Sequence, residues 1–154
     1  MHPFFSLLLY LLAAFFSTIA FSVLFSVPKR QYLFCGAVGA FGYAVFYLVS
    51  LKAEAVLATF FATVAVALSS RLLAVARKCP VTVLMIPGII PLAPGAGVYY
   101  TAYNLMRGDA SAAAYANETL KIALAIVLGI IIVFALPIKR RAFMPRPRKT
   151  SEKS

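Results

Sequence analysis

The sequence predicts an all-α protein, a polytopic bundle of transmembrane helices with about five spans and a broken fourth helix. Three observations support this fold class. Of the 154 residues, 63% are hydrophobic and only 12% are charged, whereas soluble domains are about half apolar and about a quarter charged. The apolar residues form runs close to the length of about 20 residues that crosses the hydrocarbon core of a bilayer. One of these runs is interrupted by a cluster of prolines and glycines.

Each expected span is an apolar run that ends at a charged or proline-containing segment. The first run has no basic start and no clear cleavage site, so we interpret it as a retained span and not as a secretory signal. A more polar connection that begins at Arg107 separates the last two runs. The expected spans are residues 4–27, 32–51, 55–76, 81–106 and 118–136.

The two parts of the chain differ in charge. Residues 1–138 form the expected transmembrane domain, and residues 139–154 form a basic tail that we expect to be cytoplasmic and disordered. The net charge of +11 is concentrated in this tail, directly after an apolar run. A topology anchor or a contact with anionic lipid explains such a tail better than nucleic-acid binding does. The tail cations are Lys139, Arg140, Arg141, Arg146, Arg148, Lys149 and Lys153.

The charge distribution also predicts the orientation of the chain in the cell membrane. Lys and Arg in short loops favour the cytoplasm. Five spans with the N-terminus outside place twelve cations on the inner face and only Lys52, Arg107 and Lys121 on the outer face. A four-span alternative, in which the fourth segment is re-entrant, would place Lys29 and the tail on opposite faces. We therefore expect a multi-pass protein of the plasma membrane with its C-terminus in the cytoplasm.

The stretch PGIIPLAPGAG, residues 87–97, contains three prolines and three glycines inside the fourth run. Proline removes a backbone hydrogen bond from a helix, and glycine costs about 1 kcal/mol relative to alanine. Broken backbone at membrane depth is tolerated only where protein buries it or where it lines a polar cavity. We therefore expect two half-helices, one ending near Ile86 and one starting near Gly95, joined by an unwound stretch.

The start of the second half-helix is the candidate binding site. Its free backbone amides and positive dipole end suit a carboxylate, and secondary transporters hold substrates at discontinuous helices. The alternatives are a packing kink or a surface loop, and the tyrosines that follow could equally form an interfacial aromatic belt. The candidate substrate-binding residues are Gly88, Pro91, Pro94, Gly95, Gly97, Tyr99, Tyr100 and Asn104.

Three stretches resemble the membrane domain of the threonine/serine exporter family. They are FSVLFSVP (21–28), GAVGAFGY (36–43) and above all IPGIIPLAPGAGVYYTAYNLMRGD (86–109). More narrowly, the chain is similar over nearly its whole length to the small, separately encoded YjjB-type subunit. The resemblance implies export of small carboxylate-bearing solutes, either threonine and serine or a dicarboxylate such as succinate. It also implies a larger partner subunit that carries the family's other domain.

Three charged residues are candidates for a coupling role. No acidic residue lies deep in any expected span, although proton-coupled carriers usually place a carboxylate or histidine there. The proton site therefore lies on the partner, or Glu118 or Asp109 serves from the outer end. Arg71 is expected to extend to the inner surface, or to meet a substrate carboxylate if it faces inward.

Several other functions are not expected. The sequence shows no paired carboxylates, no nucleophile with a base and no metal-ligand cluster, so we expect neither an enzyme nor a bound metal or cofactor. Cys35 and Cys79 are interpreted as free thiols, and Gly36, Gly39 and Gly42 as points of close helix packing. The alternative function is a non-transporting membrane scaffold or assembly subunit, and an oligomer of the chain is left open.

Overall fold

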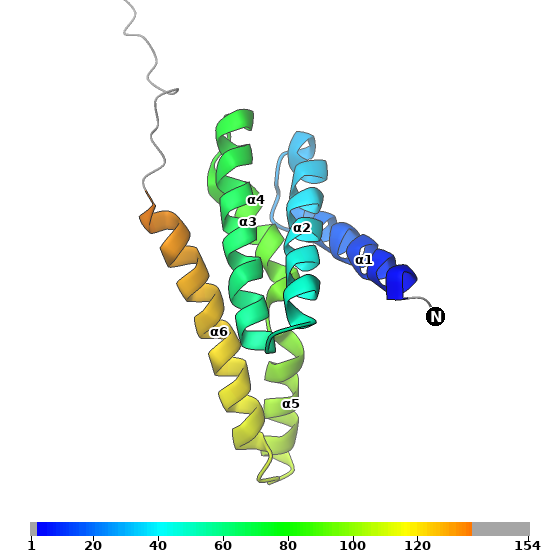
Figure 1. Ribbon diagram of the computed structural model, residues 1–154, viewed down its shortest axis with the longest axis vertical. Coiled ribbons are helices and arrows are strands. Elements are labelled where there is room, and N and C mark those ends of the chain that lie inside the picture. The colour runs from blue at the N-terminus through cyan, green and yellow to red at the C-terminus, as the bar shows by residue number, and fades with distance from the viewer. Residues whose placement is uncertain (1–2, 137–154) are drawn as a thin grey trace, which may run out of the picture.

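The computed structural model describes residues 3–136 (Figure 1). Within this range the chain forms helices and no strand, which confirms the predicted all-α fold. The expected basic tail, residues 139–154, lies outside the described residues. The helices are α1 (Pro3–Leu24), η1 (Lys29–Gln31), α2 (Tyr32–Ser50), α3 (Ala55–Arg77), α4 (Val81–Ile89), η2 (Ile90–Leu92), α5 (Gly95–Met106) and α6 (Ala112–Ala135).

The described residues contain four helices that are long and apolar enough to cross a membrane, namely α1, α2, α3 and α6. The segments Val81–Leu92 and Gly95–Met106 pass the same test together and are bent by 49° at their junction. At about 1.5 Å per residue, the 19 residues of α2 and the 23 of α3 extend about 29 and 35 Å. These lengths match a hydrocarbon core of about 30 Å, so the chain has up to five crossings, as predicted.

The fifth span is longer than predicted at its start. The sequence predicts a start near Glu118, but α6 begins at Ala112. Three consecutive alanines form this first turn, and alanine is the best helix former even where the sequence is only weakly apolar. Glu118 therefore lies in the second turn of α6 and not at its N-terminus, beyond the first turn where the helix dipole acts on a charge.

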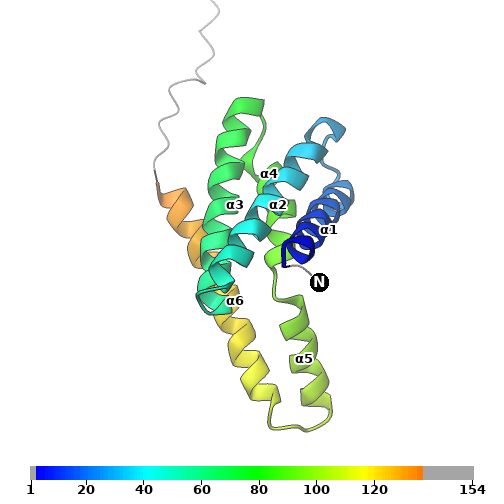
Figure 2. The same ribbon diagram turned by 45° about the vertical axis from the view of Figure 1, so that its right-hand side comes forward.

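The helices form a bundle with a projecting arm. α2 packs against α1, α3 and α4, while α6 packs along α3. Both views show α5 and the first half of α6 extending past the turn that joins α2 to α3 (Figures 1 and 2). α5 packs mainly against α6, and none of its residues is buried. We call α5, the following turn and residues 112–121 of α6 the arm.

Glycines allow the bundle helices to approach one another closely. A Cβ atom added at Gly39 would overlap the side chain of Thr18 on α1, and one at Gly42 would overlap Val66 on α3. A Cβ at Gly36 would lie 2.7 Å from the ring of Phe15. These contacts confirm the prediction that the three glycines of α2 are points of close helix packing.

Candidate substrate site at the broken helix

The break in the fourth segment is shorter than the sequence predicts. The first half-helix does not end near Ile86, because α4 continues through Pro87 to Ile89 and η2 extends the coil to Leu92. Only Ala93 and Pro94 leave the helical conformation. Leu92 is buried against the central parts of α2 and α3, so the break begins where the chain leaves the interior of the bundle.

A hydrogen bond from the thiol of Cys35 helps α4 to continue through Pro87. Pro87 has no N–H, so the carbonyl of Val83 lacks its usual helical donor. The thiol of Cys35 on α2 donates a hydrogen bond to this carbonyl, with 3.5 Å between sulfur and oxygen. Cys35 is fully buried, and both cysteines are free, as predicted. A tertiary contact thus supplies the hydrogen bond that the local sequence removes.

Gly88 is part of the helix packing in this conformation. It is buried, and a Cβ added there would lie 2.9 Å from Val38 on α2 and 3.1 Å from Val66 on α3. Pro91 is half-buried in the next turn. Gly88 therefore faces the bundle interior and Pro91 lies just before the break, whereas the candidate residues from Pro94 onward lie at and after it.

The first turn of α5 has two free amides. The Gly95 N–H donates to the Ala93 carbonyl at 2.8 Å, and the Val98 N–H donates to the Pro94 carbonyl at 3.1 Å. Within residues 3–136, the amides of Ala96 and Gly97 have no backbone acceptor. The sequence predicts free backbone amides from residue 95 to residue 98. In the structure, only the amides of Ala96 and Gly97 are free.

The two glycines of this turn have different surroundings. A Cβ added at Gly97 would overlap the hydroxyl of Thr119 on α6, so this glycine allows α5 and α6 to pack. A Cβ added at Gly95 would have no atom of another described segment within 4 Å, and Gly95 has an ordinary backbone conformation. Neither packing nor backbone geometry therefore explains the glycine at position 95.

Tyrosines line the arm beyond this turn. Tyr99 stacks on Tyr103 with 6.0 Å between ring centroids, and Tyr100 stacks on Tyr115 of α6 at 5.6 Å. The Arg107 guanidinium donates to the Tyr103 hydroxyl at 2.9 Å. Within the described chain these four tyrosines are 39 to 61% exposed, so a large part of their surface is free to contact lipid, solute or another protein.

Tyr115 is the member of this cluster that sequence reasoning missed. It lies in the segment that the sequence analysis assigned to a polar connection, but it is on the first turn of α6. A helix start at Ala112 would have placed it opposite α5. The candidates Tyr100 and Asn104 lie one turn apart on α5, where Asn104 is half-buried.

The three coupling candidates do not lie together. Asp109 accepts a hydrogen bond from the Ser111 N–H at 3.0 Å in the turn of the arm, and Glu118 is exposed on α6. Arg71 instead contacts the opposite end of α6. Arg71 contacts the carbonyl of Val133. Val133 is 14 residues beyond Thr119, the residue that follows Glu118, and this separation corresponds to about 21 Å along the helix at about 1.5 Å per residue.

Arg71 caps the C-terminal end of α6. Its guanidinium donates to the carbonyls of Val133 and Leu136, the latter at 3.0 Å, and lies 5.3 Å from the centroid of the Phe134 ring. The last carbonyls of a helix lack helical donors and carry the negative end of the dipole. Arg71 therefore joins α3 to α6.

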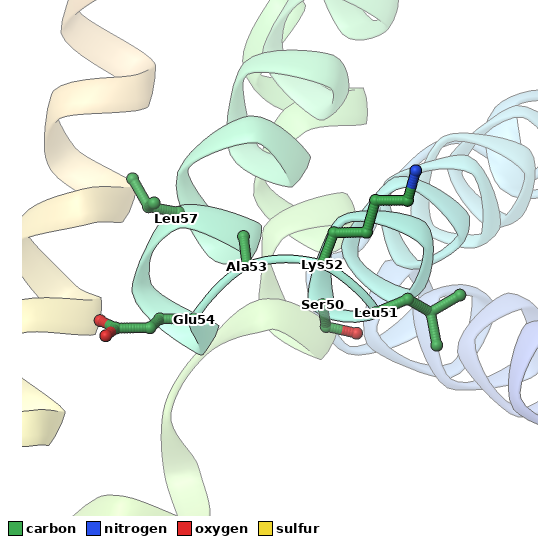
Figure 3. Close-up of a pocket in the computed structure, with 6 residues that line it drawn as sticks. All are labelled: Ser50, Leu51, Lys52, Ala53, Glu54 and Leu57. Carbon is green, nitrogen blue, oxygen red and sulfur yellow. The ribbon is translucent and has the colours of Figure 1, made fainter.

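An open hollow of about 730 Å³ lies at the turn between α2 and α3 (Figure 3). Its lining residues are Ser50, Leu51, Lys52, Ala53, Glu54 and Leu57. The side chains of Lys52 and Glu54 point away from one another (Figure 3). Because the charges diverge and no candidate residue lines it, this hollow lacks the converging polar groups of a binding site.

These features define a polytopic helical membrane protein whose proline-broken segment is typical of secondary transporters. A model of one family, described as "Threonine/Serine exporter, ThrE", matches residues 10–136. The chain therefore belongs to the threonine/serine exporter family, as its motifs indicate. Neither the curated proteins nor the solved structures include a match to this chain.

Proposed function

We propose that this chain is the membrane subunit of a secondary transporter that exports small carboxylate-bearing solutes. The substrate is threonine and serine or a dicarboxylate such as succinate. The observation that carries the proposal is the first turn of α5, where two unpaired amides lie beside a glycine that the chain itself does not require. Family membership supports the same function.

The substrate carboxylate lies against the amides of Ala96 and Gly97. The dipole of α5 favours an anion there by about 0.3 to 2 kcal/mol. The absence of a side chain at Gly95 lets the ligand approach the backbone. Tyr99, Tyr100 or Asn104 then contacts the polar substituents that distinguish one carboxylate from another.

The remaining candidates support this turn. Pro91 and Pro94 determine where the helix is interrupted, and Gly88 allows α4 to pack closely against α2 and α3. Asp109 or Glu118 supplies a coupling carboxylate from the outer end, unless the partner does so. Arg71 has a positioning role, because its guanidinium already binds the α6 carbonyls.

A larger subunit of the same family completes the transporter. Up to five spans without a deep acidic group among the described residues leave little from which to build a coupled pathway, and α5 has no buried residue. Proteoliposomes that contain this chain alone should show no substrate-dependent flux, whereas the two-subunit complex should transport. Robust coupled flux from the single chain would contradict the need for a partner.

The arm faces the outside of the plasma membrane in this proposal. The transmembrane domain, residues 1–138, has its N-terminus outside, and residues 139–154 are cytoplasmic. An impermeant thiol reagent added outside should label a cysteine placed beside Lys52 or Asp109 but not one at Ser151. The reverse labelling pattern would contradict the orientation.

Substrate protection tests the site itself. Cysteines introduced as Ala96→Cys and Tyr100→Cys should become less reactive when saturating substrate is added to a complex that still transports. A cysteine introduced as Leu72→Cys, on an exposed position of α3, serves as the control and should not be protected. Unchanged reactivity at both test positions would place the site elsewhere and leave the break as a hinge.

A membrane scaffold is the alternative, and the exposed surface of α5 is the observation that favours it. The substitution Gly95→Val separates the two functions, because its side chain would point into open space in this chain. Loss of efflux from an intact complex supports transport through this site. Loss of assembly alone supports the scaffold.

A further inference from the structure

A second cleft lies at the other end of the bundle from the arm. It has a volume of about 240 Å³ and separates the segment after α1 from α4. Its lining is mostly apolar, with one hydroxyl residue on each wall. The lining residues are Phe25, Ser26, Val27 and Pro28 on one wall, and Thr82, Val83, Ile86 and Pro87 on the other.

The core holds these two walls together. Val27 is buried in a cluster with Ala74 of α3 and Leu84 of α4, and Cys79 and Val83 pack against the same cluster. The connection from α1 to η1 and the turn from α3 to α4 therefore lie side by side. The cleft therefore lies between two segments that pack against the same core cluster.

Four cations adjoin the cleft. Lys29 and Arg30 directly follow one wall, and Arg77 and Lys78 precede the other wall in the turn between α3 and α4. All four are exposed. The guanidinium of Arg77 lies 3.6 Å from the centroid of the Phe34 ring, which fixes it beside the start of α2.

No acidic group neutralises this end among the described residues. Glu54 lies at the turn between α2 and α3, and Asp109 and Glu118 lie on the arm, so all three described carboxylates are at or beyond the opposite end of α2 and α3. Within residues 3–136, no carboxylate lies at the end of the bundle that carries these four cations, which we call the basic rim and define as Lys29, Arg30, Arg77 and Lys78.

The depth of the cleft suits a lipid. α2 begins and α3 ends at the basic rim, so the rim lies at the headgroup level if these helices span the bilayer. From Thr82 the cleft follows α4 by more than one turn to Pro87, and Ile86 is half-exposed beside it. An apolar channel below a basic rim matches an acyl chain below an anionic headgroup.

We propose that this cleft binds an anionic phospholipid. The phosphate lies among the cations of the basic rim, and one acyl chain lies between Val27 and Ile86. The inference is independent of the export site, because no residue of the cleft belongs to the α5 turn. A general preference of cations for the cytoplasmic side requires no cleft, so a variant that changes only the cleft separates the two explanations.

The test uses the full chain purified into nanodiscs of phosphatidylcholine with a minor fraction of phosphatidylglycerol. Native mass spectrometry then measures how much phosphatidylglycerol the protein retains. The triple variant Lys29→Gln, Arg30→Gln, Lys78→Gln should retain at least about tenfold less than the wild type. The matched control Lys52→Gln, Arg107→Gln, Lys121→Gln removes the same charge from the other end and should retain the wild-type amount.

A cleft-filling variant tests the apolar part. Thr82 is exposed at the cleft wall, so Thr82→Phe should occupy the space while leaving all four cations and the core in place. The Thr82→Phe variant should retain less phosphatidylglycerol than the wild type, although its melting temperature in nanodiscs of pure phosphatidylcholine should equal that of the wild type. Equal retention by the wild type and the basic-rim variant, or an equal loss in the matched control, would overturn the proposal. Displacement of the lipid by inorganic phosphate alone would also overturn it, because the acyl chain would then contribute nothing.

Discussion

In the bundle, Gly39, Gly42 and Gly88 each meet a branched side chain of a neighbouring helix. In the arm, Gly95 meets no other described segment, and Gly108 lies in a turn with φ of +68°. Gly97 also has a packing role, against Thr119 of α6, so Gly95 is the glycine at the start of α5 that packs against no other described segment. A glycine that the chain does not need for its own packing or backbone geometry is a candidate for contact with something outside the chain.

The two regions also differ in how polar groups are satisfied. In the bundle, the hydroxyls of Thr18 and Thr63 donate to carbonyls one turn earlier, at 2.7 and 2.8 Å. At the start of α5, the amides of Ala96 and Gly97 have no backbone partner within residues 3–136. The buried hydroxyl of Ser70 on α3 is an exception, because it has no hydrogen-bond partner among the described residues. In the arm, the free groups are backbone amides that lie beside Gly95.

The largest effect is expected from the bundle substitution Gly42→Ala. Its Cβ would overlap Val66, and overpacking a close contact costs about 1 to 3 kcal/mol. Thermal unfolding in detergent should show a clear loss of stability. The double variant Gly42→Ala, Val66→Ala should regain part of the stability that the single variant loses. Wild-type stability for the single variant would contradict the packing role.

The substitution Arg71→Met tests the link between the bundle and the helix that forms the arm. It removes the donors to two carbonyls of α6 and should cost about 1 to 3 kcal/mol of stability. Proteolysis near Leu136 should also become faster, because the end of α6 is no longer held. A direct role in substrate binding predicts something else, namely loss of substrate protection at position 96 with normal stability.

Gly97→Ala should have a smaller effect, of about 1 kcal/mol, at the low end of the range for overpacked contacts. The added methyl group overlaps Thr119 between two partly exposed helices. Thr119→Ala should restore stability in the double variant, as measured by unfolding in detergent. If export is also restored, the glycine at position 97 is needed for packing and not for ligand approach.

The smallest effect on stability is expected from Gly95→Ala, within about 0.5 kcal/mol. Its methyl group points into open space in the described chain. Under the proposed function, efflux from the two-subunit complex should nevertheless fall, and Gly95→Val should abolish it. Ile89→Leu serves as a control that keeps volume and polarity and should transport well. Normal efflux with Gly95→Val would contradict a ligand-contact role for Gly95 and so the proposed difference between the glycines of the bundle and this glycine of the arm.

The features that local sequence could predict are those set by hydropathy and by proline. The apolar runs predict the helices, and the prolines and glycines of residues 87–97 predict a broken segment whose second half-helix starts near Gly95, as α5 does. The continuation of α4 through Pro87 was missed because the hydrogen bond to the Val83 carbonyl comes from Cys35, 48 residues before Val83 in the chain. The difference between Gly95 and Gly97 was missed for the same reason, because it depends on where Thr119 of α6 lies.

Arg71 illustrates the same limit. Its place near the end of an expected span predicts a side chain that reaches the membrane surface. The sequence does not show that the end of α6 lies within reach, 62 residues further along the chain. Only the tertiary contacts show that Arg71 caps α6, and a contact of this residue with substrate stays a prediction.

The hydrogen bond between Cys35 and Val83 determines how the labelling experiments must be prepared. Such experiments usually begin from a chain without native cysteines. Replacing Cys35 by alanine would leave the Val83 carbonyl unpaired in the bundle core, at a cost of about 1 to 3 kcal/mol. Cys35→Ser keeps a donor at this position and is the better background. Cys79 is only half-buried, so in the native chain it is the thiol that a reagent reaches first.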